Sequence, residues 1–397
     1  MRVLYLASAP RLDSSVPAGH TLHIERTIRG LEEAGHEVER LLAGDSPAAR
    51  RAKRGYRRFG RRLTSVLRFA LRDLYWLLND ASVYRRCLRS FRGVPFDFVY
   101  ERATQFHRSG SRVAATWRIP HVYELNSPVE ELSLRDSMPP LQRVALRRQR
   151  RNLDRAAAVV VGSHALRERL IESGIAAKRV HVIYPTAGDE WFCRGASHDD
   201  RPGAPPPAAA IGLEGKLVIG FVGSIRGLRR LDLLPQAAAA ILPACSDVHF
   251  LLVGDGDARG SLEAQFAAAG LDGHVTFTGR VPHTVAAELC LAMDVCVIPD
   301  GSCYATPTKL FEYGALGRCV VAANVAPIAE IVRDGVTGRL VAPGDAAELA
   351  RVLLTLLGDA SLRRDLGRRL RAELRAAHTW RRNTERLIDI VGSARQD

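Results

Sequence analysis

Strand-like and helix-like segments alternate along most of this chain, and that alternation limits the folds it can adopt more than any other feature. The apolar run Val3–Ala7 is followed by a segment from His23 to Gly35 whose apolar residues recur with helical spacing. Later runs have the length and β-branched content of buried strands. The predicted strands of the first half are Val3–Ala7, Glu37–Leu42, Phe96–Tyr100, His121–Leu125, Ala156–Gly162 and Val180–Tyr184.

A proline-rich run, Asp199–Pro207, interrupts this pattern and has the composition of a linker. The alternation then restarts and continues to a helical tail that begins with Ala346–Leu357. The predicted strands are Leu217–Val222, His249–Val253, Val275–Thr278, Val295–Ile298 and Cys319–Ala323, and the predicted helices include Leu231–Leu242, Arg259–Gly270, Thr284–Ala292 and 327–334.

Strand–helix alternation on both sides of a linker predicts an α/β protein with two Rossmann-like, doubly wound parallel-sheet domains facing a cleft. We expect an N-terminal domain over residues 1–195, a linker over 196–212 and a C-terminal domain over 213–375. A C-terminal helix over 376–397 is expected to pack back on the N-terminal domain. Ligands of such sheets bind at the carboxyl ends of the strands, so the cleft is the expected active site.

Composition is that of an ordinary globular protein. The chain has 397 residues, 47% of them hydrophobic and 25% charged, and no uncharged apolar stretch approaches the ~18–20 residues that span a bilayer. The start, Met1–Ala7, lacks the long apolar core of a signal peptide. The seven cysteines are odd in number and form no C-x-x-C pair, which indicates reduced thiols and no zinc site. We therefore expect a cytoplasmic protein.

The net charge of +14 is concentrated in one segment. Residues 50–92 contain fourteen Lys or Arg against Asp73 and Asp80, and apolar residues alternate there with arginines in a helical rhythm. A basic amphipathic helical insert of this kind suits an anionic membrane surface, such as the inner face of the plasma membrane, or an acidic partner. The alternative is that the basic segment binds nothing. The chain has four lysines in all, so its many arginines then stand where other proteins use lysine. Specific nucleic-acid binding is not expected, because no nucleic-acid motif accompanies the charge.

The stretch from Thr306 to Gly317 combines a proline turn, a short helix with one acidic residue, and a following strand. The start of the helix offers free N–H groups and a positive dipole end to an anion. Glu312, about two turns in, is able to accept hydrogen bonds from neighbouring hydroxyls. An anion next to a diol describes a nucleotide diphosphate and its ribose. The alternative is a surface helix with a solvated glutamate.

Two further turns follow predicted strands. After Gly223-Ser224 the chain runs into Arg226, Arg229 and Arg230, and guanidinium groups bind diphosphate oxygens bidentately. The turn at 254–257 lacks the spacing of a dinucleotide fingerprint and indicates a tight turn without metal.

The segment 17–23 follows the first predicted strand and opens the first helix. Gly19 allows backbone N–H groups to approach a phosphate or a sugar. His20 and His23 are candidates for phosphate contacts or proton transfer. Helix capping or a satisfied core position is the alternative for either histidine.

Taken together, these motifs resemble the retaining glycosyltransferases of the GT4 family, which have the GT-B architecture. The resemblance covers nearly the whole chain and is strongest over residues 217–345. The matching elements are Gly223-Ser224, Val253–Gly256, Phe277–Val281, Glu312, the run from Glu330 through Asp345, Gly35–Val38 and Tyr123–Pro128.

The resemblance implies that Glu312 holds the donor ribose, Arg229 binds the diphosphate, Gly19 lies beside the phosphate or sugar, and Val281 contacts the base through its backbone. It also implies catalysis without a metal, with a UDP- or GDP-sugar as co-substrate. The residues expected to act in catalysis are Arg229, Lys309 and Glu312. The donor-binding set is Gly19, His20, Ser224, Arg226, Arg229, Val281, Thr306, Pro307, Lys309, Leu310 and Glu312, and the acceptor set is His23, Tyr123 and Asn126.

The sequence departs from the family pattern at three positions. Tyr304 stands where many members have a first glutamate, Ser224 where many have arginine, and Tyr123 where some have histidine. A non-catalytic nucleotide-sugar-binding or scaffold protein on the same fold is therefore the competing hypothesis. An epimerase or a phosphorylase is a nearer rival, but the cleft carboxylates and histidines of the one and the pyridoxal lysine of the other are not evident in the sequence.

Overall fold

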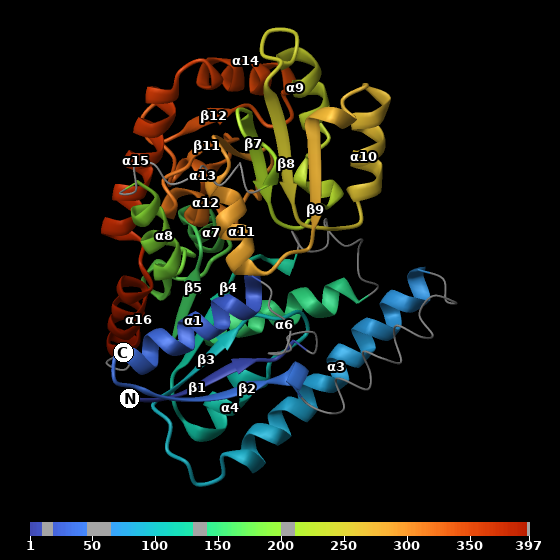
Figure 1. Ribbon diagram of the computed structural model, residues 1–397. Coiled ribbons are helices and arrows are strands. Elements are labelled where there is room, and N and C mark those ends of the chain that lie inside the picture. The colour runs from blue at the N-terminus through green and yellow to red at the C-terminus, as the bar shows by residue number, and fades with distance from the viewer. Residues whose placement is uncertain (10–18, 46–64, 130–140, 200–210, 395–397) are drawn as a thin grey trace. The chain divides into compact units, whose positions relative to one another are not determined.

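The computed structural model describes residues 1–9, 19–45, 65–129, 141–199 and 211–394 (Figure 1). Contacts divide the chain into two compact units. Unit 1 consists of Met1–Tyr184 and Arg381–Asp397, and unit 2 of Pro185–Trp380. Each unit is built on its own six-stranded sheet, and every strand pair in both sheets is parallel. The predicted fold class, two doubly wound α/β units, is confirmed.

The sheet of unit 1 has the strand order β2-β1-β3-β4-β5-β6. Its strands are β1 (Arg2–Ala7), β2 (Glu37–Leu42), β3 (Phe98–Arg102), β4 (His121–Leu125), β5 (Ala158–Val161) and β6 (Val180–Val182). Its helices are α1 (Gly19–Glu33), α3 (Ser65–Ser90), α4 (Ser109–Trp117), α6 (Gln142–Arg155), α7 (His164–Glu172) and most of α16 (Trp380–Ala394).

Both faces of β1 are buried, because its side chains alternate between two hydrophobic clusters. Val3 and Tyr5 pack with residues of α1 and with Leu387 of α16. Leu4 and Leu6 belong to the other cluster, with residues of α3 and α4. This arrangement explains why β1 reads as an unbroken apolar run, as expected for a central parallel strand.

The sheet of unit 2 has the order β12-β11-β10-β7-β8-β9. Its strands are β7 (Leu217–Val222), β8 (Val248–Val253), β9 (Val275–Gly279), β10 (Val295–Ile298), β11 (Cys319–Ala323) and β12 (Arg339–Val341). Its helices are α8 (Asp189–Asp199), α9 (Leu233–Ile241), α10 (Arg259–Ala268), α11 (His283–Leu291), α12 (Thr308–Ala315), α13 (Ala326–Ala329), α14 (Ala346–Leu357) and α15 (Ala360–Ala377).

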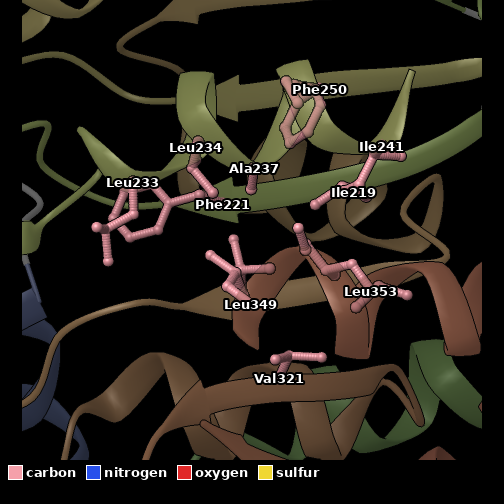
Figure 2. Close-up of a cluster of buried hydrophobic side chains, with 14 of the residues drawn as sticks. Ile219, Phe221, Leu233, Leu234, Ala237, Ile241, Phe250, Val321, Leu349 and Leu353 are labelled. Carbon is pink, nitrogen blue, oxygen red and sulfur yellow. The ribbon is translucent and has the colours of Figure 1, made fainter. Parts of the chain in front are cut away.

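Figure 2 shows the main core of unit 2, where side chains of β7 meet those of two helices. Phe221 and Ile219 of β7 are fully buried. They pack with Leu234 of α9 and with Leu349 of α14 in one continuous cluster. This packing holds β7 in place, and the candidate site lies at the carboxyl end of this strand.

The division into units corrects the predicted boundary. The first unit ends at Tyr184 and not at residue 195, because α8 belongs to unit 2. Gly195 of α8 lies so close to α12 that an added Cβ would be 2.7 Å from the carbonyl oxygen of Ala315. The predicted linker 196–212 therefore starts inside α8, and its residues 200–210 lie outside the described part of the chain.

Two local predictions also need correction. The helix expected over 327–334 is the single turn α13, because the chain beyond it forms a bridge between Asp334 and Gly338 and enters β12. That short strand was not predicted. Helix α1 begins at Gly19, earlier than the predicted His23.

The strand order reverses once in each sheet. In unit 1 the chain moves outward from β1 to β2 and then returns to the other side of β1 with β3. In unit 2 it moves outward from β7 to β9 and then returns to β7 with β10. At such a switch point the connections after the two adjacent strands diverge, and open α/β sheets bind ligands there.

We predict that Gly367→Ala destabilises unit 2 strongly. A Cβ at this position of α15 would collide with the backbone carbonyl of Gly317, in the turn between α12 and β11, and a backbone obstacle has little freedom to move. We expect a lower thermal unfolding midpoint and a loss of about 1–3 kcal/mol or more in the free energy of unfolding. Gly260→Ala in α10 is the matched control, because an added Cβ there meets nothing within 4 Å. Equal midpoints for the two variants would contradict the prediction.

Candidate active site

Two segments meet at the switch point of unit 2, the turn after β7 and the start of α12 after β10. The ammonium of Lys309, on α12, lies over the ring of Phe221, with Nζ 3.5 Å from the ring centroid. This is a cation–π contact. A Cβ on Gly223 would lie 2.7 Å from the same Nζ, and Gly223 has φ of 147°, a conformation that other residues rarely adopt. The backbone conformation therefore favours glycine at this turn, and the missing Cβ leaves space for the lysine ammonium.

Tyr313 fixes α12 against the end of β7. Its hydroxyl accepts a hydrogen bond of 2.7 Å from the backbone N–H of Val222, the last residue of the strand. The tyrosine is fully buried, and burial raises its pKa well above the ordinary value, so it stays protonated. Because Tyr313 adjoins Glu312 on α12, the same contact sets where that carboxylate lies.

The ammonium of Lys309 is surrounded by charges of both signs. Burial lowers its pKa well below the ordinary value, and the Arg229 guanidinium lowers it further, while Glu312 and Asp300 act in the opposite direction. Three of the predicted site residues, Arg229, Lys309 and Glu312, are therefore close enough to interact electrostatically. Two cations held together at the start of a helix favour the binding of an anion.

Glu312 has a partner that the sequence did not reveal. Its Oε1 lies 3.0 Å from Nε2 of His283, the first residue of α11. The His283 ring is in turn 4.9 Å from that of Trp191, between centroids. The side chain of Glu312 remains 15% exposed and that of His283 29% exposed. The histidine therefore orients the carboxylate but leaves it accessible to a ligand. A fixed, accessible carboxylate is suited to accept hydrogen bonds from a diol.

The other predicted donor-side residues have different environments. Ser224 and Arg226 are exposed in the turn after β7, and Val281 follows β9 and is half-buried. Pro307 is the N-cap residue of α12. Their predicted contacts with a donor remain predictions.

Two members of the donor set are occupied within the protein. Thr306 is buried, and its hydroxyl donates to the carbonyl oxygen of Pro327 over 3.2 Å. Leu310 is fully buried, and its N–H donates to the carbonyl oxygen of Pro307. The structure therefore offers no side-chain contact between Leu310 and a ligand.

The glycine-rich turn after β8 supports the turn after β7. A Cβ on Gly254 would collide with the carbonyl of Gly223, and one on Gly256 with that of Ile225. The Gly223 N–H donates to Val253 over 2.9 Å. Within the described residues, no group of three or more His, Cys, Asp or Glu is arranged to hold a metal. The close approach of two backbones is the physical reason for the glycines.

A second charged cluster lies at the switch point of unit 1. Oε1 of Glu124, on β4, accepts hydrogen bonds from Arg102 over 2.8 Å and from Asn126 over 2.7 Å. Nε2 of His23, on α1, lies 2.8 Å from the same oxygen. The cluster thus joins the carboxyl ends of β3 and β4 to the helix that follows β1.

Glu124 is held in its ionised form. Burial alone would raise its pKa, but the Arg102 guanidinium and then the His23 imidazole outweigh burial and bring the pKa well below the ordinary 4.5. The carboxylate is 4% exposed and Arg102 16%, so the pair is shielded from water. His23 is 23% exposed and remains accessible from outside.

The predicted acceptor residues do not form one group. His23 and Asn126 meet at Glu124, but Tyr123 is on the other face of β4, since neighbouring residues of a strand point to opposite sides. There it is fully buried, and its ring centroid lies 5.7 Å from that of His121. Its predicted role stays a prediction. Gly19 is the first residue of α1, followed by His20.

Sequence reasoning missed three residues of these clusters, namely His283, Arg102 and Glu124. His283 directly follows a proline at the start of a helix, after the strand that ends near Val281, so its place beyond a strand end was a usable signal. Arg102 and Glu124 are charged residues at the ends of strands. Their position at the carboxyl ends of the strands, more than their residue type, marks them as candidate site residues.

Comparisons with known proteins identify the family and the fold. The family model "Glycosyl transferases group 1" matches residues 216–359, and the model "Glycosyl transferase 4-like domain" matches residues 18–186. The structure of HepE from Anabaena in complex with UDP resembles this one with a TM-score of 0.71 at 19% identity, covering 99% of this chain and 100% of that one. The fold is therefore GT-B, and the chain belongs to the group 1 glycosyltransferases of the GT4 type.

Two curated relatives come from Streptomyces kanamyceticus. The 2-deoxystreptamine glucosyltransferase is 35% identical over 42% of this chain and 41% of its own length. The alpha-D-kanosaminyltransferase is 28% identical over 54% of this chain and 55% of its own length. The chain thus spans about half the length of these relatives.

We predict that Glu124→Gln destabilises unit 1. The change removes the charge that compensates buried Arg102, and breaking a buried pair costs about 3–5 kcal/mol. Because folding lowers the pKa of Glu124, its contribution is fully present above the ordinary value of 4.5 and is lost as the pH falls below that value. The difference between wild type and variant in denaturant unfolding should therefore shrink in acid.

Glu25→Gln is the control, because Glu25 is exposed on α1, the helix that carries His23. We expect it to unfold like the wild type at every pH. A Glu124→Gln protein as stable as this control at pH 7 would contradict the assignment of a compensated buried pair.

Proposed function

We propose that this protein is a retaining glycosyltransferase that moves a sugar from a nucleotide-diphosphate sugar to a glycan, a lipid-linked acceptor or a small molecule. One observation carries the proposal. Lys309, Arg229 and Glu312 interact at the switch point of unit 2, with Lys309 placed against the Gly223 turn. Cations next to an oriented carboxylate match two adjacent parts of a nucleoside diphosphate, its phosphates and its ribose.

Each residue has a separate role in this proposal. Arg229 and Lys309 bind the diphosphate and stabilise the negative charge that grows on it as the glycosidic bond breaks. Glu312, oriented by His283, accepts hydrogen bonds from the ribose hydroxyls and takes no part in proton transfer. Transfer by this arrangement needs no metal, because the two side-chain cations supply the positive charge.

The reaction exchanges one bond for another at the anomeric carbon. The bond from that carbon to the diphosphate oxygen breaks, and the departing oxygen takes the electron pair. The acceptor hydroxyl forms the new bond on the same face, and its proton passes to an oxygen of the departing diphosphate. The configuration of the sugar is therefore retained.

The donor is proposed to be a UDP- or GDP-sugar. HepE, which shares the fold at 19% identity, was crystallised with UDP and with UDP-glucose. This favours UDP as the first nucleotide to test. The curated 2-deoxystreptamine glucosyltransferase adds 2-deoxystreptamine to the acceptor panel, and the curated kanosaminyltransferase adds a kanosaminyl donor.

The competing function is nucleotide-sugar binding without catalysis. Tyr304, in place of the first glutamate of many family members, is the feature that favours it. Tyr304 lies in the loop between β10 and α12, and its backbone N–H donates to the hydroxyl of Ser302 over 3.0 Å. Turnover separates the two functions, since a binding module gives neither transfer nor slow hydrolysis of the donor.

We predict that Arg229→Gln lowers kcat/KM for transfer or donor hydrolysis by about 100-fold, the usual cost of one lost charge-stabilising group. Arg230→Gln is the control, because Arg230 adjoins Arg229 but pairs with Asp232. Glu312→Ala should weaken donor binding about 10-fold or more, with a smaller change in kcat. NMR of the product anomer tests retention. Donor binding without turnover, across a broad acceptor panel, would favour the competing function.

We also predict that binding of UDP is coupled to the uptake of a proton by Lys309. In the free protein its pKa is lowered by burial and by Arg229, and a bound diphosphate would raise it. Between these two pKa values binding takes up a proton, so the affinity falls as the pH rises through this window. Calorimetry in two buffers of different ionisation enthalpy, at one pH, measures the uptake.

Lys309→Met should bind UDP more weakly and lose the dependence of the binding heat on the buffer. Lys216→Met is the control, because Lys216 is exposed and pairs with Asp247. A dependence that survives unchanged in Lys309→Met would assign the proton to another group and refute the prediction.

A further inference from the structure

Helix α3 directs its two acidic residues inward. Asp73 is fully buried and pairs with Arg72 over 2.9 Å. Asp80 is also buried, accepts a hydrogen bond from the backbone N–H of Arg108, and pairs with Arg148 over 3.0 Å. The solvent-facing side of this helix therefore carries no negative charge.

That outer side carries leucines. Leu67, Leu71, Leu74 and Leu78 are 48%, 46%, 49% and 65% exposed. Their spacing of four, three and four residues places them along one face of the helix. Six large apolar side chains are exposed in the described part of the chain, and four of them form this one stripe. Scattered exposed leucines are ordinary on a protein surface, but an aligned row of four indicates a contact surface.

The same face continues into arginines. Arg85 and Arg89 follow Leu78 by seven and eleven residues, which returns to the same side of a helix with 3.6 residues per turn. Both arginines are exposed. We call the six residues Leu67, Leu71, Leu74, Leu78, Arg85 and Arg89 the outer face of α3. It is apolar over its first half and cationic over its second.

We propose that the outer face of α3 docks on an anionic membrane surface. None of the described helices is long and apolar enough to cross a bilayer. A helix that lies in the interface instead buries its apolar side chains at the boundary between headgroups and acyl chains, while long basic side chains reach the headgroups. The leucines supply the apolar contact, and the arginines select anionic lipid.

Charge decides between this occupant and a second copy of the chain. Two outer faces brought together would oppose Arg85 and Arg89 to each other or to leucines, in a protein whose net charge is +14. Anionic lipid instead neutralises this charge. The proposal does not depend on glycosyl transfer, but the two together favour the lipid-linked class of acceptor.

Vesicle sedimentation tests the proposal with the full chain. Wild-type protein is expected to sediment with phosphatidylcholine vesicles containing about a third phosphatidylglycerol, and not with vesicles of pure phosphatidylcholine. The double variant Leu71→Gln/Leu78→Gln should bind the anionic vesicles at least ~10-fold more weakly. Its matched control, Val285→Gln/Val336→Gln, changes two exposed valines of unit 2 and should bind like the wild type.

The variant Arg85→Gln/Arg89→Gln tests the cationic half. It should lose several-fold in affinity for anionic vesicles, and the binding that remains should depend less on salt concentration than that of the wild type. Unchanged thermal unfolding of both double variants establishes that the substitutions act at the surface.

Three results would overturn the proposal. The first is equal binding of wild type to neutral and anionic vesicles, and the second is undiminished binding by the leucine variant. The third is a dimer in sedimentation velocity that the leucine variant converts to monomer, which would assign the face to a second copy.

Discussion

The reversal of strand order beside β1 and β7 is the constraint on which both charged clusters depend. Parallel strands need a crossover for every connection, so the direction of winding changes only where the chain returns to its first strand. At this switch point, beyond the carboxyl ends of the strands, the connections after two adjacent strands diverge. The space between them holds side chains from both connections. Lys309 meets the Gly223 turn there in unit 2, and Glu124 meets His23 and Arg102 there in unit 1.

The contact between Lys309 and the β7 turn explains several otherwise separate features of unit 2. Gly223 has φ of 147°, which favours glycine, and its missing Cβ leaves the space that the ammonium occupies. Gly254 has no Cβ because its backbone packs against the carbonyl of Gly223. Tyr313 holds α12 at the height at which the lysine reaches the Phe221 ring. The glycine turns after β7 and β8 and the start of α12 look like separate ligand-binding motifs in the sequence. In the structure they pack against one another.

The sequence was sufficient to predict the two parallel sheets, most strands and the convergence of Arg229, Lys309 and Glu312. The sheets and strands follow from local periodicity, whereas the grouping of these three residues was implied by the resemblance to the GT4 family. The sequence was not sufficient for the unit boundary, because α8 follows unit 1 in the chain but packs against α12. Nor did it reveal His283 beside Glu312 or Glu124 beside His23, since both pairs join residues far apart in sequence and only the tertiary fold decides which charged residues meet.

The two clusters differ in how their charge is balanced, and we propose that this difference gives them different tasks. Around Lys309, burial and Arg229 outweigh Glu312 and Asp300, so an arriving anion improves the electrostatic energy of the site. Around Glu124 the charges already compensate one another within the protein, because Arg102 and His23 outweigh the cost of burial and keep the carboxylate ionised. Ligand affinity should therefore originate in unit 2. The carboxylate of unit 1 serves as a fixed frame that holds His23 and Asn126 in place.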